Sequence, residues 1–162
     1  MGKLFLILIF VAAIGACSES SPPSKQEAAP SPENRLAELQ KKADAGDAEA
    51  QFTLGEMYYK GKEAPKDAAK AVEWYQKAAA QGNIDAYFAI GRMHYNGEGV
   101  PKNVAEAVEW FQKAAAQGHA KAQFYLGEMY LNVKSVPKDT AKAMEWYQKA
   151  AAQGNIDAYF AI

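Results

Sequence analysis

The sequence predicts an all-α protein, namely a short α-solenoid (superhelix) of antiparallel helix-hairpin repeats. The main observation is a phrase of about 36 residues that occurs three times without a gap, over 47–82, 83–118 and 119–154. A period between about 20 and 50 residues is typical of solenoids, propellers and related arrays. Each copy also contains two apolar stripes at helical spacing and many alanines, and both features favour a solenoid made of helices.

Each repeat is expected to consist of two helices joined by a short loop. In the first repeat, Ala50, Leu54 and Tyr58 are four residues apart and form the apolar stripe of the first helix. Ala71 and Tyr75 have the same spacing and belong to the stripe of the second helix. Each repeat is therefore predicted to fold as one helix hairpin.

Three sets of residues predict where these helices end and meet. Capping side chains are expected at the start of the second helices, at Asp67, Asn103 and Asp139. The second helices are expected to end at the glycines that close the repeats, Gly82, Gly118 and Gly154. A glycine inside a helix costs about 1 kcal/mol relative to alanine, so we expect it to allow close approach of the paired helix. Such glycines fall within the first helices, at Gly55, Gly91 and Gly127.

Residues 1–16 have the pattern of a bacterial signal peptide. Lys3 precedes the apolar run 4–14, which as a helix would be about 16 Å long, too short for a hydrocarbon core of about 30 Å. The segment 14–17 resembles the lipobox of bacterial lipoproteins, which implies cleavage before Cys17 and lipid attachment to its thiol. We therefore expect a lipid-anchored protein of the cell envelope. Ser18 favours the outer membrane, facing the periplasm or the cell surface, over the inner membrane.

Two short segments are expected between the lipid and the repeats. Residues 17–33 hold several prolines and serines and lack aromatic or branched aliphatic side chains, so they are expected to form a disordered tether. Residues 34–46 align with a second helix but carry polar residues where that helix has alanines. A polar half-repeat is typical of the end of a solenoid, so we predict an N-terminal capping helix there.

The phrase EWYQKAAAQGNIDAYFAI occupies both 73–90 and 145–162. Its copies lie two repeats apart, which indicates duplication of a repeat pair. Residues 155–162 are thus interpreted as the truncated start of a fourth repeat, from a shortened or incompletely read gene. The alternative is an uncapped C-terminal end that recruits a partner or mediates self-association.

The repeats resemble the Sel-one-like family of tetratricopeptide-like repeats. The family pattern L-G-x-x-Y…A-x-x-x-Y/F-x-x-A is met in the first repeat by Leu54, Gly55, Tyr58, Ala71, Tyr75 and Ala78. The resemblance implies helix hairpins whose first helices line a concave face that binds proteins. The third repeat departs from the pattern, because Val133 and Ser135 replace inter-helix glycines. We expect a different, stiffer turn at that loop.

Composition and motifs argue against several other functions. The formal net charge of −1 provides no basic field for nucleic acid. His94 stands where the other repeats have Tyr and is interpreted as a core residue, whereas His119 lies at a hairpin junction without further metal ligands nearby. No catalytic residue, metal site or cofactor is predicted, and the chain is not expected to be an enzyme.

The segment 135–138 matches the S-x-x-K motif of penicillin-recognising enzymes, but the companion motifs S-D-N and K-T-G are absent. Some secreted Sel-one-like proteins bind β-lactams, and by resemblance those carry a disulfide in each repeat, which this chain cannot form. These two absences argue against an enzyme of cell-wall or β-lactam chemistry, which is kept only as an alternative. A second alternative is a toxin-neutralising or virulence-associated surface lipoprotein.

The favoured function is a membrane-anchored scaffold, adaptor or inhibitor that binds an unidentified protein or peptide across the concave face. Positions on the first helices that vary between repeats, while the core stays constant, are the candidates for contact with this partner. They are Glu49, Glu56, Tyr59, Lys60, Asp85, Arg92, Tyr95, Asn96, Lys121, Glu128, Leu131 and Asn132.

Overall fold

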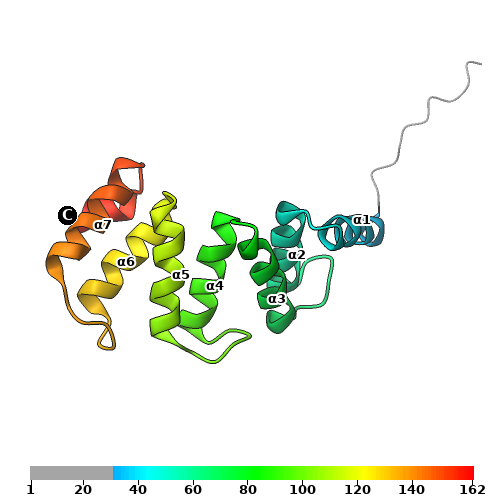
Figure 1. Ribbon diagram of the computed structural model, residues 1–162, viewed down its shortest axis with the longest axis horizontal. Helices are drawn as coiled ribbons and strands as arrows, with labels where there is room; N and C mark the ends of the chain where they lie inside the picture. The colour runs from blue at the N-terminus through cyan, green and yellow to red at the C-terminus, as the bar shows by residue number, and fades with distance from the viewer. Residues whose placement is uncertain (1–30) are drawn as a thin grey trace, which may run out of the picture.

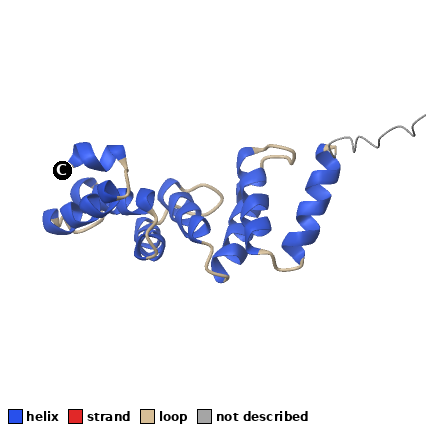
Figure 2. Ribbon diagram, turned by 90° about the horizontal axis from the view of Figure 1, so that it is seen from above, coloured by secondary structure: helices blue, strands red, loops and turns tan. Residues whose placement is uncertain are grey.

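The computed structural model describes residues 31–162, which form helices and no strand (Figures 1 and 2). The helices follow one another along a linear array, and each contacts mainly its neighbours in sequence. Their bounds are α1 Pro32–Asp44, α2 Ala48–Lys60, α3 Ala68–Ala80, α4 Ile84–Asn96, α5 Val104–Ala116, α6 Ala120–Asn132, α7 Thr140–Ala152 and α8 Ile156–Ala161. The predicted α-solenoid is therefore confirmed. The predicted signal peptide, Cys17 and most of the tether lie outside the described residues.

The helices begin at side chains that accept hydrogen bonds from the first turn. Asp67 Oδ1 accepts from the backbone N–H of Lys70 at 3.0 Å, and Asp139 Oδ1 accepts from that of Lys142 at 3.0 Å. Asn103 caps α5 in the same way. The three predicted N-caps are thus confirmed, because each satisfies a backbone N–H that has no partner inside its helix.

Helix α1, the predicted N-terminal capping helix, starts slightly earlier than the sequence suggested. The helix expected over 34–46 occupies Pro32–Asp44, so residues 32 and 33 belong to it rather than to the predicted tether. Ser31 accounts for this correction, since its hydroxyl accepts a hydrogen bond from the backbone N–H of Asn34 at 3.3 Å. Proline is also favoured in the first turn of a helix, where its missing N–H costs nothing.

Each hairpin closes on the glycine inside its first helix. A Cβ at Gly55 would lie 2.6 Å from Tyr75 Cδ1, and one at Gly91 would lie 2.7 Å from Phe111 Cδ1. Gly127 is equally close to Tyr147. The predicted close approach is therefore confirmed, and the ring of the second helix occupies the space that a side chain would need.

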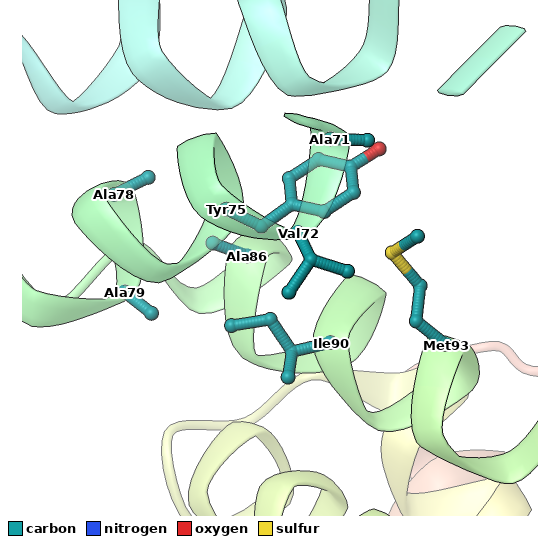
Figure 3. Packing of buried hydrophobic residues seen from close by; sticks show 8 residues of the cluster. All are labelled: Ala71, Val72, Tyr75, Ala78, Ala79, Ala86, Ile90 and Met93. Atoms are coloured by element: carbon teal, nitrogen blue, oxygen red, sulfur yellow. The ribbon is translucent and has the colours of Figure 1, made fainter. Parts of the chain in front are cut away.

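The core runs continuously through the array instead of stopping at each hairpin. Val72 and Tyr75 of α3 pack with Ile90 and Met93 of α4, so the second helix of one repeat joins the first helix of the next (Figure 3). Trp110 of α5 packs against the same cluster. Neighbouring repeats consequently share buried surface, which fixes the first helices side by side.

The loop of the third repeat differs from its two equivalents, as predicted. Gly61 and Gly97 end α2 and α4 in the left-handed conformation, with φ of 69° and 78°. Val133 occupies the same position after α6 in an extended conformation, with φ of −93°. A β-branched residue disfavours positive φ, so the chain leaves this helix in another direction.

Candidate functional site

The candidate site is the surface formed by α2, α4 and α6, here called the first-helix face. Contacts between consecutive repeats connect these three helices, for example from Arg92 of α4 to Tyr59 of α2 and from His119, the N-cap of α6, to Asp85 of α4. All twelve predicted binding residues belong to α2, α4 or α6, and none of them is buried. The structure therefore places the whole predicted set where a ligand could reach it.

Four residues of this face and Tyr75 of α3 form a group that is here called the Arg92 cluster: Glu56, Tyr59, Lys60, Tyr75 and Arg92. The Tyr75 hydroxyl donates to Glu56 Oε1 at 2.6 Å, and Lys60 forms an ion pair with the same carboxylate. Arg92 Nη2 donates to the Tyr59 hydroxyl at 3.2 Å. The cluster thus joins the first two repeats and contains four of the twelve predicted residues.

Aromatic rings surround the guanidinium of Arg92. Its central carbon lies 5.8 Å from the centroid of the Tyr59 ring and 6.0 Å from that of the Phe88 ring. These distances fit cation–π attraction. No carboxylate among residues 31–162 forms a salt bridge with Arg92. The guanidinium is therefore held in place by rings and a hydroxyl, and retains N–H groups for an external acceptor.

The charges of the cluster are set by its hydrogen bonds. Burial would raise the pKa of Glu56, but Lys60, the Tyr75 hydroxyl and Arg92 outweigh burial and hold it below its usual value. Burial and the hydrogen bond to Glu56 both raise the pKa of Tyr75. At neutral pH the Glu56 carboxylate is thus ionised and the Tyr75 hydroxyl is neutral.

The third repeat has a related arrangement without the arginine. The Tyr147 hydroxyl donates to Glu128 Oε1 at 2.5 Å, and Asn132 Nδ2 donates to Glu128 Oε2 at 3.0 Å. Leu131 packs against the buried cluster that contains Tyr147. Glu128 therefore corresponds to Glu56 in both position and partner. The second repeat has Arg92 at this position, and Phe111, which offers no hydroxyl, at the position of the tyrosines.

Three predicted residues near the starts of the first helices divide into two kinds. Glu49 accepts a hydrogen bond from Asn83 Nδ2 at 3.3 Å, and Asp85 Oδ1 lies 3.2 Å from His119 Nε2. These two carboxylates hold consecutive repeats together. Lys121 is exposed and has no salt bridge among residues 31–162.

The structure gives His119 a structural role at the junction of the second and third repeats. Its Nδ1 accepts a hydrogen bond from the backbone N–H of Ala122 at 3.1 Å and so caps α6. Its ring stacks on Phe88 with centroids 4.5 Å apart. Burial lowers the pKa of His119, although Asp85 acts in the opposite direction. His119 thus replaces the Asp and Asn caps of the other repeats.

Two predicted residues lie apart from the Arg92 cluster, near the end of α4. The Tyr95 ring centroid is 5.6 Å from Lys102 Nζ, and Tyr95 packs against the core shared with the third repeat. Asn96 Nδ2 donates to Glu98 at 3.2 Å. Both extend the first-helix face towards the loops of the hairpins.

Tyr75 and Phe88 belong to the site but were not predicted as parts of it. Tyr75 was assigned to the apolar stripe of the second helix. One signal could have identified Tyr75. Glu56 and Glu128 occur in repeats that have Tyr in the second helix, and Arg92 occurs in the repeat that has Phe111. Such paired change indicates contact between the two positions.

The residues considered for chemistry are His94, Ser135 and Lys138. His94 is buried, and its Nδ1 lies 3.1 Å from Glu106 Oε2. Ser135 and Lys138 are exposed in the loop before α7, not at the start of a helix. Within residues 31–162, no three His, Cys, Asp or Glu side chains are grouped as a metal site. In the same region, no helix has the length and hydrophobicity that crossing a bilayer requires.

Comparison with known proteins places the repeats in a family. The model of the Sel1 repeat matches residues 48–83, 84–119 and 120–155, each one residue later than the predicted repeat boundaries. A crystal structure of a protective antigen from uropathogenic Escherichia coli, with an SLR fold, is 43% identical and has a TM-score of 0.71. The match covers 74% of this chain and 26% of that one.

Two further relatives differ widely in length. A Sel1 repeat protein from Oxalobacter formigenes is 38% identical with a TM-score of 0.70, and the match covers 77% of this chain and 94% of that one. The secretory immunoglobulin A-binding protein EsiB of Escherichia coli O6:H1 is 42% identical over 40 residues. This match covers 25% of the chain but only 8% of EsiB. Since the family model covers more than half of the sequence, the chain belongs to the Sel1 repeat family.

Proposed function

We propose that this protein binds a peptide or another protein across its first-helix face and acts as a scaffold, adaptor or inhibitor in the bacterial cell envelope. Sel1 repeat proteins are generally protein-interaction modules rather than catalysts. For this chain, the observation that carries the proposal is Arg92, a partly exposed guanidinium held between Tyr59 and Phe88. Arginine and tyrosine are the residue types that most often dominate the energy of protein interfaces.

The shape of the Arg92 cluster also favours a macromolecular ligand over a small molecule. The cavity that Glu56, Tyr75 and Arg92 line has a volume of ≈ 10 Å³. That volume holds about one water molecule, whereas sites for small molecules measure about 300–1,000 Å³. A ligand would therefore lie over the cluster and cover several first helices, as an extended segment or a helix does.

Capture from solubilised cell envelopes tests the site. The unmodified protein should retain a specific partner, and Arg92→Ala combined with Tyr95→Ala should reduce its recovery at least tenfold, because both changes truncate the first-helix face. Lys113→Ala is the matched control, since Lys113 lies over Trp110 on a second helix and should leave recovery unchanged. Equal recovery with the double variant would disprove the proposed face.

Lipid attachment to Cys17 is a separate part of the proposal, supported by the lipobox-like segment 14–17 and not by the folded region. Metabolic labelling with an alkyne analogue of palmitate, followed by membrane fractionation, tests it. The natural protein should be labelled and sediment with membranes, and Cys17→Ala should abolish both. A Cys17→Ala protein that keeps its label would show that the lipid is attached elsewhere or that the assignment is wrong.

A second candidate function is a surface lipoprotein that binds a host protein. Its support is the similarity to a protein named for binding secretory immunoglobulin A and to a protective antigen of uropathogenic strains. Antibody binding to intact bacteria distinguishes the two locations. Labelling of intact cells would favour the host-facing function, and labelling only after outer-membrane permeabilisation would favour a periplasmic partner.

A further inference from the structure

A groove between α1 and α2 occupies the position that a first helix fills elsewhere in the array. Leu39 of α1 lines it together with Thr53, Glu56 and Met57 of α2. Its volume is ≈ 450 Å³. It lies at the N-terminal end of the array and is not part of the protein-binding function proposed above, although Glu56 and Lys60 belong to both sites.

The equivalent place one repeat later is almost completely filled. There the corresponding residues are Tyr75, Ala89, Arg92 and Met93, and the remaining cavity is only ≈ 10 Å³. The filling comes from α2, which contributes Glu56 and Tyr59 as the other lining residues. The groove beside α1 thus has the wall and floor of this contact but lacks its first helix among residues 31–162.

Exposure of one methionine position confirms this equivalence. Met93 and Met129, which have a preceding hairpin to cover them, are 2% and 1% exposed. Met57 occupies the same position in α2 and is only half-buried. Burial of apolar surface stabilises by about 25 cal/mol per Å², so a helix laid in the groove would gain from covering Met57 and Leu39.

The two filled copies of this contact define what the groove would accept. In α2 and α4 a glycine meets the ring of the second helix, at Gly55 against Tyr75 and at Gly91 against Phe111. Four residues after Gly55, Tyr59 accepts a hydrogen bond from Arg92. The groove has Leu39 in place of that ring and Glu56, which already pairs with Lys60 and accepts from Tyr75, in place of Arg92. Its occupant therefore needs a small residue and, four residues later, a donor that shares this carboxylate.

We propose that this groove binds an amphipathic helix of another protein, which completes the unpaired half-repeat from outside. The helix would carry Gly, Ala or Ser facing Leu39 and a Tyr, Lys or Arg facing Glu56. Its apolar face would cover Met57 and Thr53. Binding of an amphipathic helix in a hydrophobic groove is a common mode of protein recognition.

A peptide from this chain is a suitable probe, because residues 83–98 contain Asn83 as a cap, Gly91 as the small residue and Tyr95 as the donor. The fluorescein-labelled peptide would be titrated with the full chain and followed by fluorescence anisotropy. Binding should saturate, and a peptide with Gly91→Leu should bind at least tenfold more weakly. Absence of saturable binding would overturn the proposal.

A matched pair of variants at Thr53 locates the binding. Thr53→Arg fills the groove from the exposed side of α2 and should weaken binding at least tenfold, whereas Thr53→Ala introduces the residue of the second repeat and should bind normally. Circular dichroism should show both variants folded. Peptide binding should slow amide hydrogen exchange in α1, and protection confined to α6–α8 would contradict the proposal.

One more variant separates an external helix from the chain's own N-terminal segment. Deletion of residues 18–30 should leave the affinity for the peptide unchanged if the groove serves a partner. If the peptide bound only after this deletion, the occupant would be that segment of the same chain, and the proposal of an external helix would be wrong.

Discussion

The first and second repeats have the same fold but use different side-chain pairs at two equivalent places. Glu56 accepts a hydrogen bond from Tyr75 in the first repeat, whereas the second repeat has Arg92 and Phe111 at the two equivalent positions. Lys70 Nζ lies 5.4 Å from the ring centroid of Tyr58, and in the second repeat this pair is replaced by the buried His94 and Glu106.

The third repeat returns to the pairs of the first. Tyr147 donates to Glu128, and Lys142 Nζ lies 5.6 Å from the ring centroid of Tyr130. Both partners therefore change together, in alternating repeats. The comparison shows that glycines and alanines shared by all repeats fix the hairpin, while the pairs around them vary as matched units. The side-chain pairs consequently recur in every second repeat, in agreement with the duplication seen in the sequence.

The largest expected effect comes from disrupting the contact between glycine and aromatic ring that all three hairpins share. Gly91→Val places side-chain carbons where Phe111 Cδ1 is already 2.7 Å from an ideal Cβ, so the hairpin must open. We expect a loss of about 3 kcal/mol in the free energy of unfolding, the upper end for overpacked cores. Chemical denaturation followed by circular dichroism measures it. Gly55→Val should cost a similar amount, and a harmless valine at either site would contradict the shared role.

The next effect tests whether Glu56 and Tyr75 depend on each other for stability. Glu56→Arg gives the first repeat the first-helix residue of the second and leaves the buried Tyr75 hydroxyl without its acceptor. An unsatisfied buried hydroxyl costs about 2 kcal/mol. Adding Tyr75→Phe should recover most of this loss. If the double variant were as unstable as the sum of both single variants, the two positions would not be coupled.

A smaller effect is the pH dependence of stability that His119 causes at the junction of the second and third repeats. The folded-state pKa of His119 lies below its ordinary value because the residue is buried. The unfolded chain therefore binds more protons as the pH falls through about 6.5, so stability is retained above that pH and lost below it. His119→Asn, which copies the cap Asn83, should reduce this loss. Urea denaturation at about pH 7.5 and about pH 5.5 measures the difference, and identical pH dependence in both proteins would contradict it.

The smallest effect concerns the second pair. Lys70→Ala removes the ammonium beside Tyr58, and an exposed cation–π contact contributes about 0.5 kcal/mol. Lys142→Ala should have the same small effect in the third repeat, because the geometry is repeated there. Glu106→Ala should instead remove the carboxylate that lies 3.1 Å from His94 Nδ1, and the side-chain NMR chemical shifts of His94 at fixed pH should change. Unchanged chemical shifts of His94 in Glu106→Ala would contradict the pairing.

The sequence was sufficient to predict the hairpins, caps and close approaches, because each depends on local spacing or on a residue type with one strong preference. The side chain of Asp67 can cap a helix that begins directly after it, whatever the rest of the fold is. Gly55 inside a helix indicates close approach of another helix, although it does not show which residue makes the contact. The start of α1 could not be predicted from the sequence, since Ser31 and Pro32 suit both a tether and the start of a helix.

From the sequence, the candidate site could be predicted only as a set of accessible positions on the first helices. All twelve selected residues are accessible, but spacing along one helix does not show which residues of neighbouring repeats meet. The group of Glu56, Tyr59 and Arg92 depends on the offset between α2 and α4, which the shared core sets. Glu49 and Asp85 were chosen as ligand contacts, yet they connect consecutive repeats, because each faces the cap of the next first helix.

The most direct test of the central claim is photo-crosslinking in living cells. p-Benzoylphenylalanine would replace Asn96, which is exposed on the first-helix face, or Lys113, which is exposed on a second helix. If the first-helix face binds the partner, irradiation should give a discrete crosslinked adduct from position 96 and none from position 113. An adduct from position 113 alone would show that the protein binds through another surface.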